Sequence, residues 1–177
     1  TVICLTSKID DYKALFERYG VKYYNIISFQ SLITKNSPLV RKYKVSNSGT
    51  KKDYRYEVDI RFAAIVQQGT FLVIDEFHSL NNSLSCSYKA CIALINYINN
   101  SNGSSRYTLL SGTPTVVEST MVVFFRLFGI LHSPKLYHVA GGSIVYDGMQ
   151  EIIDCCNALD YNTTSDIMAG INMSKPK

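Results

Sequence analysis

Two adjacent acids, Asp75 and Glu76, follow directly on the apolar run at residues 71–74. Such a run is typical of a buried strand, and its end would present both carboxylates at the carboxyl edge of a parallel sheet. Phosphoryl transfer needs a metal ion that bridges phosphates and a second group that orients or deprotonates water. The pair therefore indicates Mg²⁺-nucleotide chemistry. A structural alternative stays open, in which the two acids only cap the helix that follows.

A second polar segment, residues 111–114, follows a short apolar strand predicted at residues 108–110. Between the two strands, apolar residues recur at the spacing of one helical face; they are Leu84, Tyr88, Cys91, Ile92, Ile95 and Ile98. A strand, a helix and a second strand form a unit in which the strands are parallel neighbours. The sequence therefore predicts that the two polar segments lie side by side.

The segments Val-Ile-Asp-Glu-Phe-His at 73–78 and Leu-Leu-Ser-Gly-Thr-Pro at 109–114 resemble motifs II and III of superfamily 2 helicases and translocases, in the DExH variety. Residues 2–8 resemble motif Ia of that family, and residues 26–32 resemble the segment around motif Ib. Together the four segments cover most of residues 1–131. The loops rich in Asn and Tyr are similar to those of the Swi/Snf-like helicases of large cytoplasmic DNA viruses.

The resemblance implies a RecA-like α/β domain, a parallel sheet with flanking helices, that uses ATP and Mg²⁺. Asp75 would hold Mg²⁺ through water, and Glu76 would activate the attacking water. His78 would connect the ATP site to motif III through a hydroxyl of Ser111 or Thr113. The implied coupling residues are Ser111, Gly112 and Thr113, and the implied contacts to nucleic-acid phosphates are Thr6, Ser7 and Lys8. Ser7 is equally suited to capping a helix.

The chain also departs from the family's pattern. No Gly-x-x-x-x-Gly-Lys-[Ser/Thr] loop occurs in it, so the phosphates of ATP would lack their cradle. The family's second RecA-like domain is missing as well, and Leu5 stands where the family usually has Pro. We therefore expect a fragment whose first helicase domain is incomplete at its N-terminus, and which is inactive as an ATPase when isolated.

Positive charge is concentrated at residues 35–55, where seven basic residues accompany the single acid Asp53. We expect a basic insertion there with a flexible turn at residues 46–50. Its candidate phosphate contacts are Lys42, Lys44, Lys51 and Lys52, and the interleaved tyrosines available for stacking on bases are Tyr43, Tyr54 and Tyr56. The alternative is a solvated hairpin that only keeps the protein soluble.

The composition is that of a globular α/β protein, with 177 residues, 46% hydrophobic and 18% charged. No segment has the roughly 20 uninterrupted apolar residues of a membrane span. The five cysteines form no Cys-x-x-Cys pair, and Cys4 and Cys91 fall on core-facing positions. We therefore expect an intracellular, reducing compartment such as the cytoplasm, a viral factory, a virion or the nucleus.

Two regions are expected along the chain. Residues 1–138 would form the partial RecA-like ATP-binding domain, and residues 139–177 a peripheral helix and a linker toward the missing second domain. Helices are predicted at residues 9–19, 57–68, 117–128 and 149–159. In the second of these helices, the predicted inward face comprises Ile60, Ala63 and Ala64.

Two functions from different classes remain. The first is a nucleic-acid-dependent ATPase of a DExH helicase or translocase, which unwinds or moves along a strand, with DNA favoured over RNA. The second is a non-enzymatic remnant or accessory module that binds nucleic acid or a partner protein. A third possibility, another P-loop ATPase such as a packaging motor, is disfavoured by the segments resembling motifs Ib and III.

Overall fold

The computed structural model describes residues 1–45, 53–112, 118–132, 138–145 and 147–157. The chain forms two compact units, Thr1–Pro114 and Thr115–Lys177. The expected turn at residues 46–50, together with Lys51, Lys52 and Thr113, lies outside the described residues. A compact unit is not the same thing as a domain, so the boundary expected at residue 138 stays a prediction.

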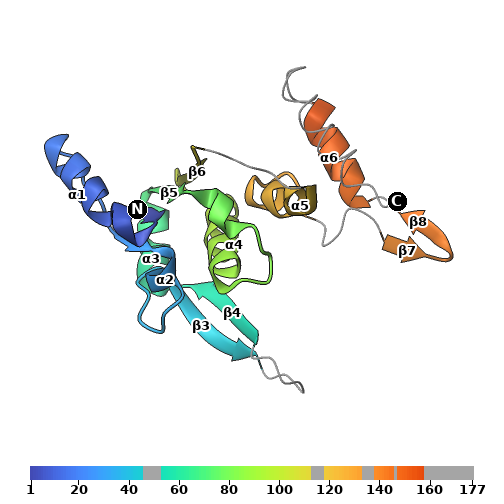
Figure 1. The fold of residues 1–177 in the computed structure, drawn as a ribbon, viewed down its shortest axis with the longest axis horizontal. Coiled ribbons are helices and arrows are strands. Elements are labelled where there is room, and N and C mark those ends of the chain that lie inside the picture. The colour runs from blue at the N-terminus through green and yellow to red at the C-terminus, as the bar shows by residue number, and fades with distance from the viewer. Residues whose placement is uncertain (46–52, 113–117, 133–137, 146, 158–177) are drawn as a thin grey trace. The chain divides into compact units, whose positions relative to one another are not determined.

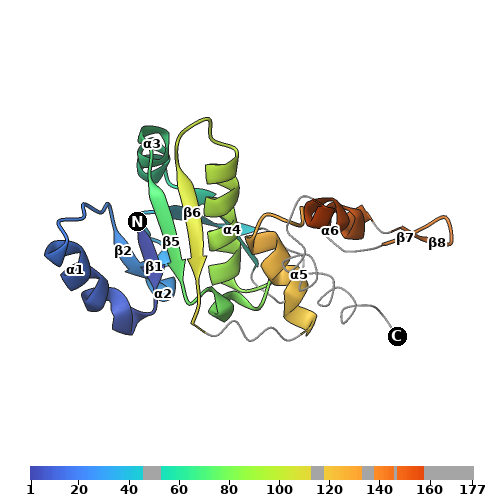
Figure 2. The same ribbon diagram turned by 90° about the horizontal axis from the view of Figure 1, so that it is seen from above.

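The first unit contains a four-stranded parallel sheet in the order β2-β1-β5-β6 (Figure 2). Its strands are β1 (Val2–Cys4), β2 (Ile26–Ser28), β5 (Phe71–Asp75) and β6 (Arg106–Leu110). Helix α4 (Cys86–Asn99) connects β5 to β6, whose register runs from Phe71 opposite Arg106 to Asp75 opposite Leu110. The expected strand-helix-strand unit with parallel strands is confirmed. The protein is thus a mixed α/β structure with helices beside a parallel sheet.

The two faces of the sheet are covered by different helices. On one face, Ile9, Tyr12 and Phe16 of α1 (Ile9–Arg18) pack against a cluster of Val2, Cys4 and Ile26. The alternate residues point to the opposite face, where Ile3, Leu72 and Ile74 are fully buried. Helix α4 contacts β6 and the short helix α2 (Phe29–Leu32). Burial on both faces explains why β5 is a nearly continuous apolar run.

The basic segment forms an antiparallel hairpin of β3 (Val40–Val45) and β4 (Asp53–Val58), which extends away from the sheet (Figure 1). Helix α4 packs against β4. At the base of the hairpin, Asp59 is only 4% exposed and accepts hydrogen bonds from Arg41 and Arg61. The hairpin is therefore held at its base by ion pairs and along its length by α4.

Helix α3 (Ile60–Gln68) starts later than predicted, because Glu57 and Val58 belong to β4 and Asp59 is the cap residue. The Asp59 carboxylate accepts the backbone N–H of Arg61 at 2.9 Å. The predicted inward face was wrong, since Ile60 is 69% exposed whereas Phe62 and Val66 are fully buried. The bulkier pair faces the core because it fills more space beside the sheet than the two alanines would.

The second unit contains α5 (Glu118–Leu127), a hairpin of β7 (His138–Ala140) and β8 (Ser143–Val145), and α6 (Asp147–Asn157). Phe124, Phe125 and Leu127 are buried. Gly141 and Gly142 both have positive φ in the turn between β7 and β8, as that Gly-Gly pair predicts. None of the helices in the described part of the chain has the length and apolar character needed to cross a membrane.

Candidate functional site at the carboxyl edge of the sheet

The two acids lie at the end of β5 and are held by local backbone geometry. Asp75 ends the strand, and its Oδ1 accepts the backbone N–H of Glu76 at 3.0 Å. Glu76 has φ 54 and ψ 44, the left-handed region, and is the one non-glycine residue with positive φ in the described part of the chain. This conformation costs roughly 1–2 kcal/mol for a residue with a Cβ and is concentrated at functional sites.

The capping alternative for the acids is not what the structure shows. Glu76 precedes the short 3₁₀ helix η2 (Phe77–Leu80), but its side chain makes no capping hydrogen bond there. The next longer helix, α4, is capped by Ser85, whose side chain accepts the backbone N–H of Tyr88. The conformation of Glu76 therefore does not serve a helix end, and its carboxylate is directed to another contact.

That contact is with His78, which also reaches the end of the neighbouring strand. His78 Nδ1 lies 3.1 Å from Glu76 Oε2 and 2.8 Å from Ser111 Oγ. A carboxylate can only accept, so the tautomer that fits carries its proton on Nδ1, and this N–H donates toward both oxygens. The expected contact between His78 and Ser111 is therefore present. Its coupling role stays a prediction, as do the roles of Gly112, which is exposed, and Thr113.

The charge of Asp75 acts on two groups of the same sheet face. Burial raises the pKa of the Cys4 thiol to about 11, and the nearby Asp75 carboxylate adds to the shift. Burial and Asp75 likewise raise the pKa of the Tyr12 phenol to about 12. Both groups are therefore neutral at physiological pH. Cys4 is fully buried, and burial also raises the pKa of Cys91, so the prediction of small apolar core cysteines is confirmed.

The donor set is suited to Mg²⁺ only in combination with a nucleotide. The described residues contain no group of three or more His, Cys, Asp or Glu that would hold a metal by itself. Mg²⁺ commonly binds one or two carboxylates and completes its shell with water and phosphate oxygens. Asp75 and Glu76 fit that pattern, since they are half-buried at the strand end. When bound, the ion would neutralise phosphate charge, and Asp75 is the residue placed to hold it.

The residues after β1 lie at the same edge of the sheet. Thr6, Ser7 and Lys8 form the 3₁₀ helix η1 (Thr6–Lys8), and all three are exposed. The Thr6 hydroxyl lies 3.3 Å from the side-chain oxygen of Gln30, which follows β2. Ser7 makes no capping hydrogen bond to η1 or to α1. The two segments that resemble motifs Ia and Ib therefore adjoin one another at an exposed surface.

The hairpin divides the candidate residues of the basic segment. Lys42 Nζ lies 4.0 Å above the centre of the Tyr54 ring, a cation–π contact, and Lys44 is exposed. Tyr43 is 43% exposed, but Tyr56 is only 6% exposed. The expectation that Tyr56 is available to stack on bases is therefore wrong, because its ring packs between the hairpin and α4.

Sequence reasoning did not single out the residues that fix the hairpin in place. Lys89 of α4 donates to Asp53 at the start of β4, and this bond lowers the pKa of Asp53. Since α4 begins close to the carboxyl edge of β5, the pair places the Val45 and Asp53 end of the hairpin on the side of the acids. No local pattern marks this pair, whose members lie 36 positions apart.

Known proteins give no guide to this site. A scan against models of protein families found no match, and neither did searches of curated proteins and of solved structures.

Proposed function

We propose that the chain is the partial first RecA-like domain of a DExH helicase or translocase, which uses ATP and Mg²⁺ to unwind or move along a nucleic acid, with DNA favoured over RNA. In this proposal Asp75 holds the metal and Glu76 orients or deprotonates the attacking water. The parallel sheet and the position of both acids at its carboxyl edge are compatible with this assignment.

The observation that carries the proposal is the position of His78 between Glu76 and Ser111. The histidine contacts the carboxylate assigned to water activation and the hydroxyl at the end of β6. A change in the position of Glu76, as nucleotide binds or leaves, would be passed to the segment that follows β6. A pair of acids that served only packing would not require such a bridge.

Support for a nucleic-acid partner comes from the arrangement of the cations. Lys42 and Lys44 belong to the hairpin whose open end lies on the side of the acids, and Lys8 is exposed at the same edge of the sheet. Cations spread along one side of a protein bind a phosphate backbone by releasing counterions. Lys8 is paired with Asp11 at 3.3 Å, an exposed contact that phosphate can displace at small cost.

The test uses a protein that contains this chain together with a phosphate-binding loop and a second RecA-like domain. We expect ATP hydrolysis stimulated by single-stranded DNA, and a loss of about 100-fold or more in Glu76→Gln, the scale of a lost general base. Glu17→Gln, an exposed acid on α1, is the matched control. Hydrolysis that survives in Glu76→Gln would remove Glu76 from its role. Binding of DNA with no hydrolysis in the unsubstituted protein would favour the accessory module instead.

A further inference from the structure

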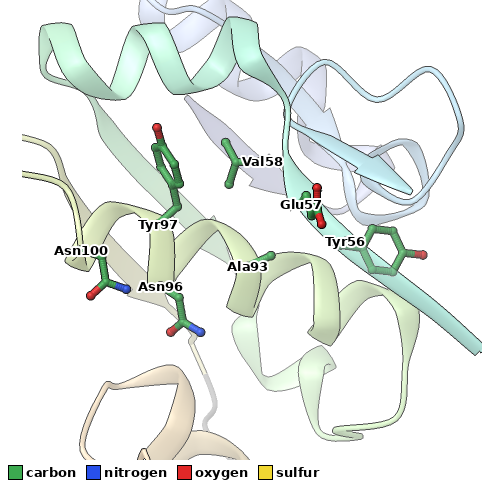
Figure 3. A pocket seen from close by; sticks show the side chains of 7 residues that line it. All are labelled: Tyr56, Glu57, Val58, Ala93, Asn96, Tyr97 and Asn100. Atoms are coloured by element: carbon green, nitrogen blue, oxygen red, sulfur yellow. The ribbon is translucent and has the colours of Figure 1, made fainter. Parts of the chain in front are cut away.

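A groove runs between β4 and α4, and we call it the β4–α4 groove. It consists of two adjoining hollows of about 430 Å³ and 390 Å³ that share Tyr56, Ala93 and Asn96. One hollow extends toward Val45 and Asp53 at the open end of the hairpin. The other extends toward Val58 and Asn100 (Figure 3). The groove therefore follows the length of the hairpin and begins on the side of the acids.

One face of α4 forms a wall of this groove. Ala93, Asn96, Tyr97 and Asn100 have the spacing of a single helical face, next to the core face that contains Leu94 and Ile98. Asn96 and Asn100 are exposed and Tyr97 is half-buried. Each amide offers two donors and an acceptor, and a tyrosine ring offers an apolar surface. The small Ala93 leaves room between them.

The groove is uncharged in effect, because the charged side chains that line it are paired with one another. Lys89 binds Asp53, and Arg55 lies 3.2 Å from Glu57. A free phosphate or a metal ion would have to break these pairs. An uncharged planar group with hydrogen-bonding edges, in contrast, would find amides and an aromatic ring available.

The strand on the other side of β4 carries unpaired positive charge. In the register of the hairpin, Lys42 lies opposite Tyr56 and Lys44 lies opposite Tyr54. Cross-strand partners share one face of a hairpin, so these lysines flank the tyrosines of the groove. A neutral groove beside a row of cations matches a single nucleic-acid strand, which has uncharged bases on one side and phosphates on the other.

We propose that the β4–α4 groove holds bases of a single nucleic-acid strand whose phosphates lie along Lys42 and Lys44. The inference rests on the proposed nucleic-acid-dependent function and adds a base subsite to it. Asn96 and Asn100 contact base edges, and Tyr97 supplies an apolar surface for a ring.

The test compares two ligands on the full chain, oligothymidylate and an abasic strand of the same length, across a salt series. We expect Asn96→Ala/Asn100→Ala to weaken oligothymidylate binding about tenfold, the scale of a lost base contact, and to leave the abasic strand unaffected. Asn99→Ala, an exposed position on the same helix outside the groove, should change neither. Alanine favours helix, so the double variant keeps the fold.

Lys42→Gln/Lys44→Gln provides the phosphate arm of the experiment. It should weaken both strands and lower the salt slope by about 2, one unit for each lost phosphate contact. Equal loss of both strands in the asparagine variant, or no loss at all, would overturn the base subsite while the phosphate contacts stand. An unchanged salt slope in the lysine variant would count instead against the nucleic-acid partner of the proposed function.

Discussion

The carboxyl edge of the sheet and the hairpin beside α4 contain comparable candidate residues but are built differently. At the sheet edge, Asp75 and Ser111 each follow a strand directly, and the parallel pairing of β5 and β6 brings them to one place. At the hairpin, Asp53 and Lys89 come from separate elements that meet only because α4 packs on β4. The first site is made by strand order and the second by packing.

The two regions also store free energy in different ways. Glu76 adopts a left-handed conformation that is unfavourable for its residue type, and the contact with His78 accompanies it. The hairpin is instead held by favourable contacts, the ion pairs of Asp59 and of Lys89. Local stability and chemistry therefore oppose each other at the sheet edge and coincide at the hairpin. The following variants test that difference.

The largest effect is expected for Asp59→Ala, which removes a cap and two ion pairs at the base of the hairpin. We expect a loss of about 2 kcal/mol in the free energy of unfolding, because a buried cap and its arginine contacts disappear together. Urea unfolding at neutral pH measures it. Asp10→Ala is the control, since the Asp10 side chain is 94% exposed. A loss no greater than that of the control would show that the hairpin is held by packing alone.

The same carboxylate gives a pH dependence. The Arg61 guanidinium, which donates to Asp59, holds the pKa of that carboxyl well below its usual range, and Arg41 adds to the effect. The stabilisation is therefore complete above the unfolded pKa of about 3.9 and is lost as the pH falls below it. Unfolding measured between neutral and acid pH should show a gap between wild type and Asp59→Ala that narrows below about pH 4. A gap that stays constant would contradict this ion-pair contribution.

A smaller effect is expected for the bridge at the sheet edge. In the protein that carries the missing ATP-site elements, His78→Ala and Ser111→Ala should each lower the stimulation of hydrolysis by DNA, by about tenfold for one coupling contact. Because the two side chains act through one hydrogen bond, the double variant should lose little more than either single variant. Ser79→Ala, an exposed neighbour, is the control. Losses that add fully would mean that the two residues act independently.

The smallest effect is a gain in stability. Glu76→Gly removes the Cβ from a left-handed position, so we expect the free energy of unfolding to rise by up to about 1 kcal/mol while hydrolysis is lost. Glu57→Gly, in the extended strand β4, is the matched control and should destabilise instead. If both variants destabilise, Glu76 is not strained, and the contrast between the two regions disappears.

Particular residues show how far local patterns reach. The apolar runs and their polar ends correctly predicted β5, β6 and α4, and strand order then predicted the contact between His78 and Ser111. The face of α3 was predicted wrongly because Ile60 is apolar, yet its helix turns Phe62 and Val66 to the core. Tyr56 lies among cations in the sequence, but α4 buries it. Periodicity indicates an element, whereas its neighbours decide which side is buried.

The sequence by itself therefore determined the alternation of strands and helices and the pairing of two acids with a polar turn on the next strand, since these depend on residues close along the chain. Only the tertiary structure decided the left-handed backbone of Glu76, the anchoring of the hairpin by Lys89 and the groove lined by Asn96 and Asn100. Each of these arises where elements distant in the sequence pack together, and the conformation of a residue then follows from its surroundings more than from its own type.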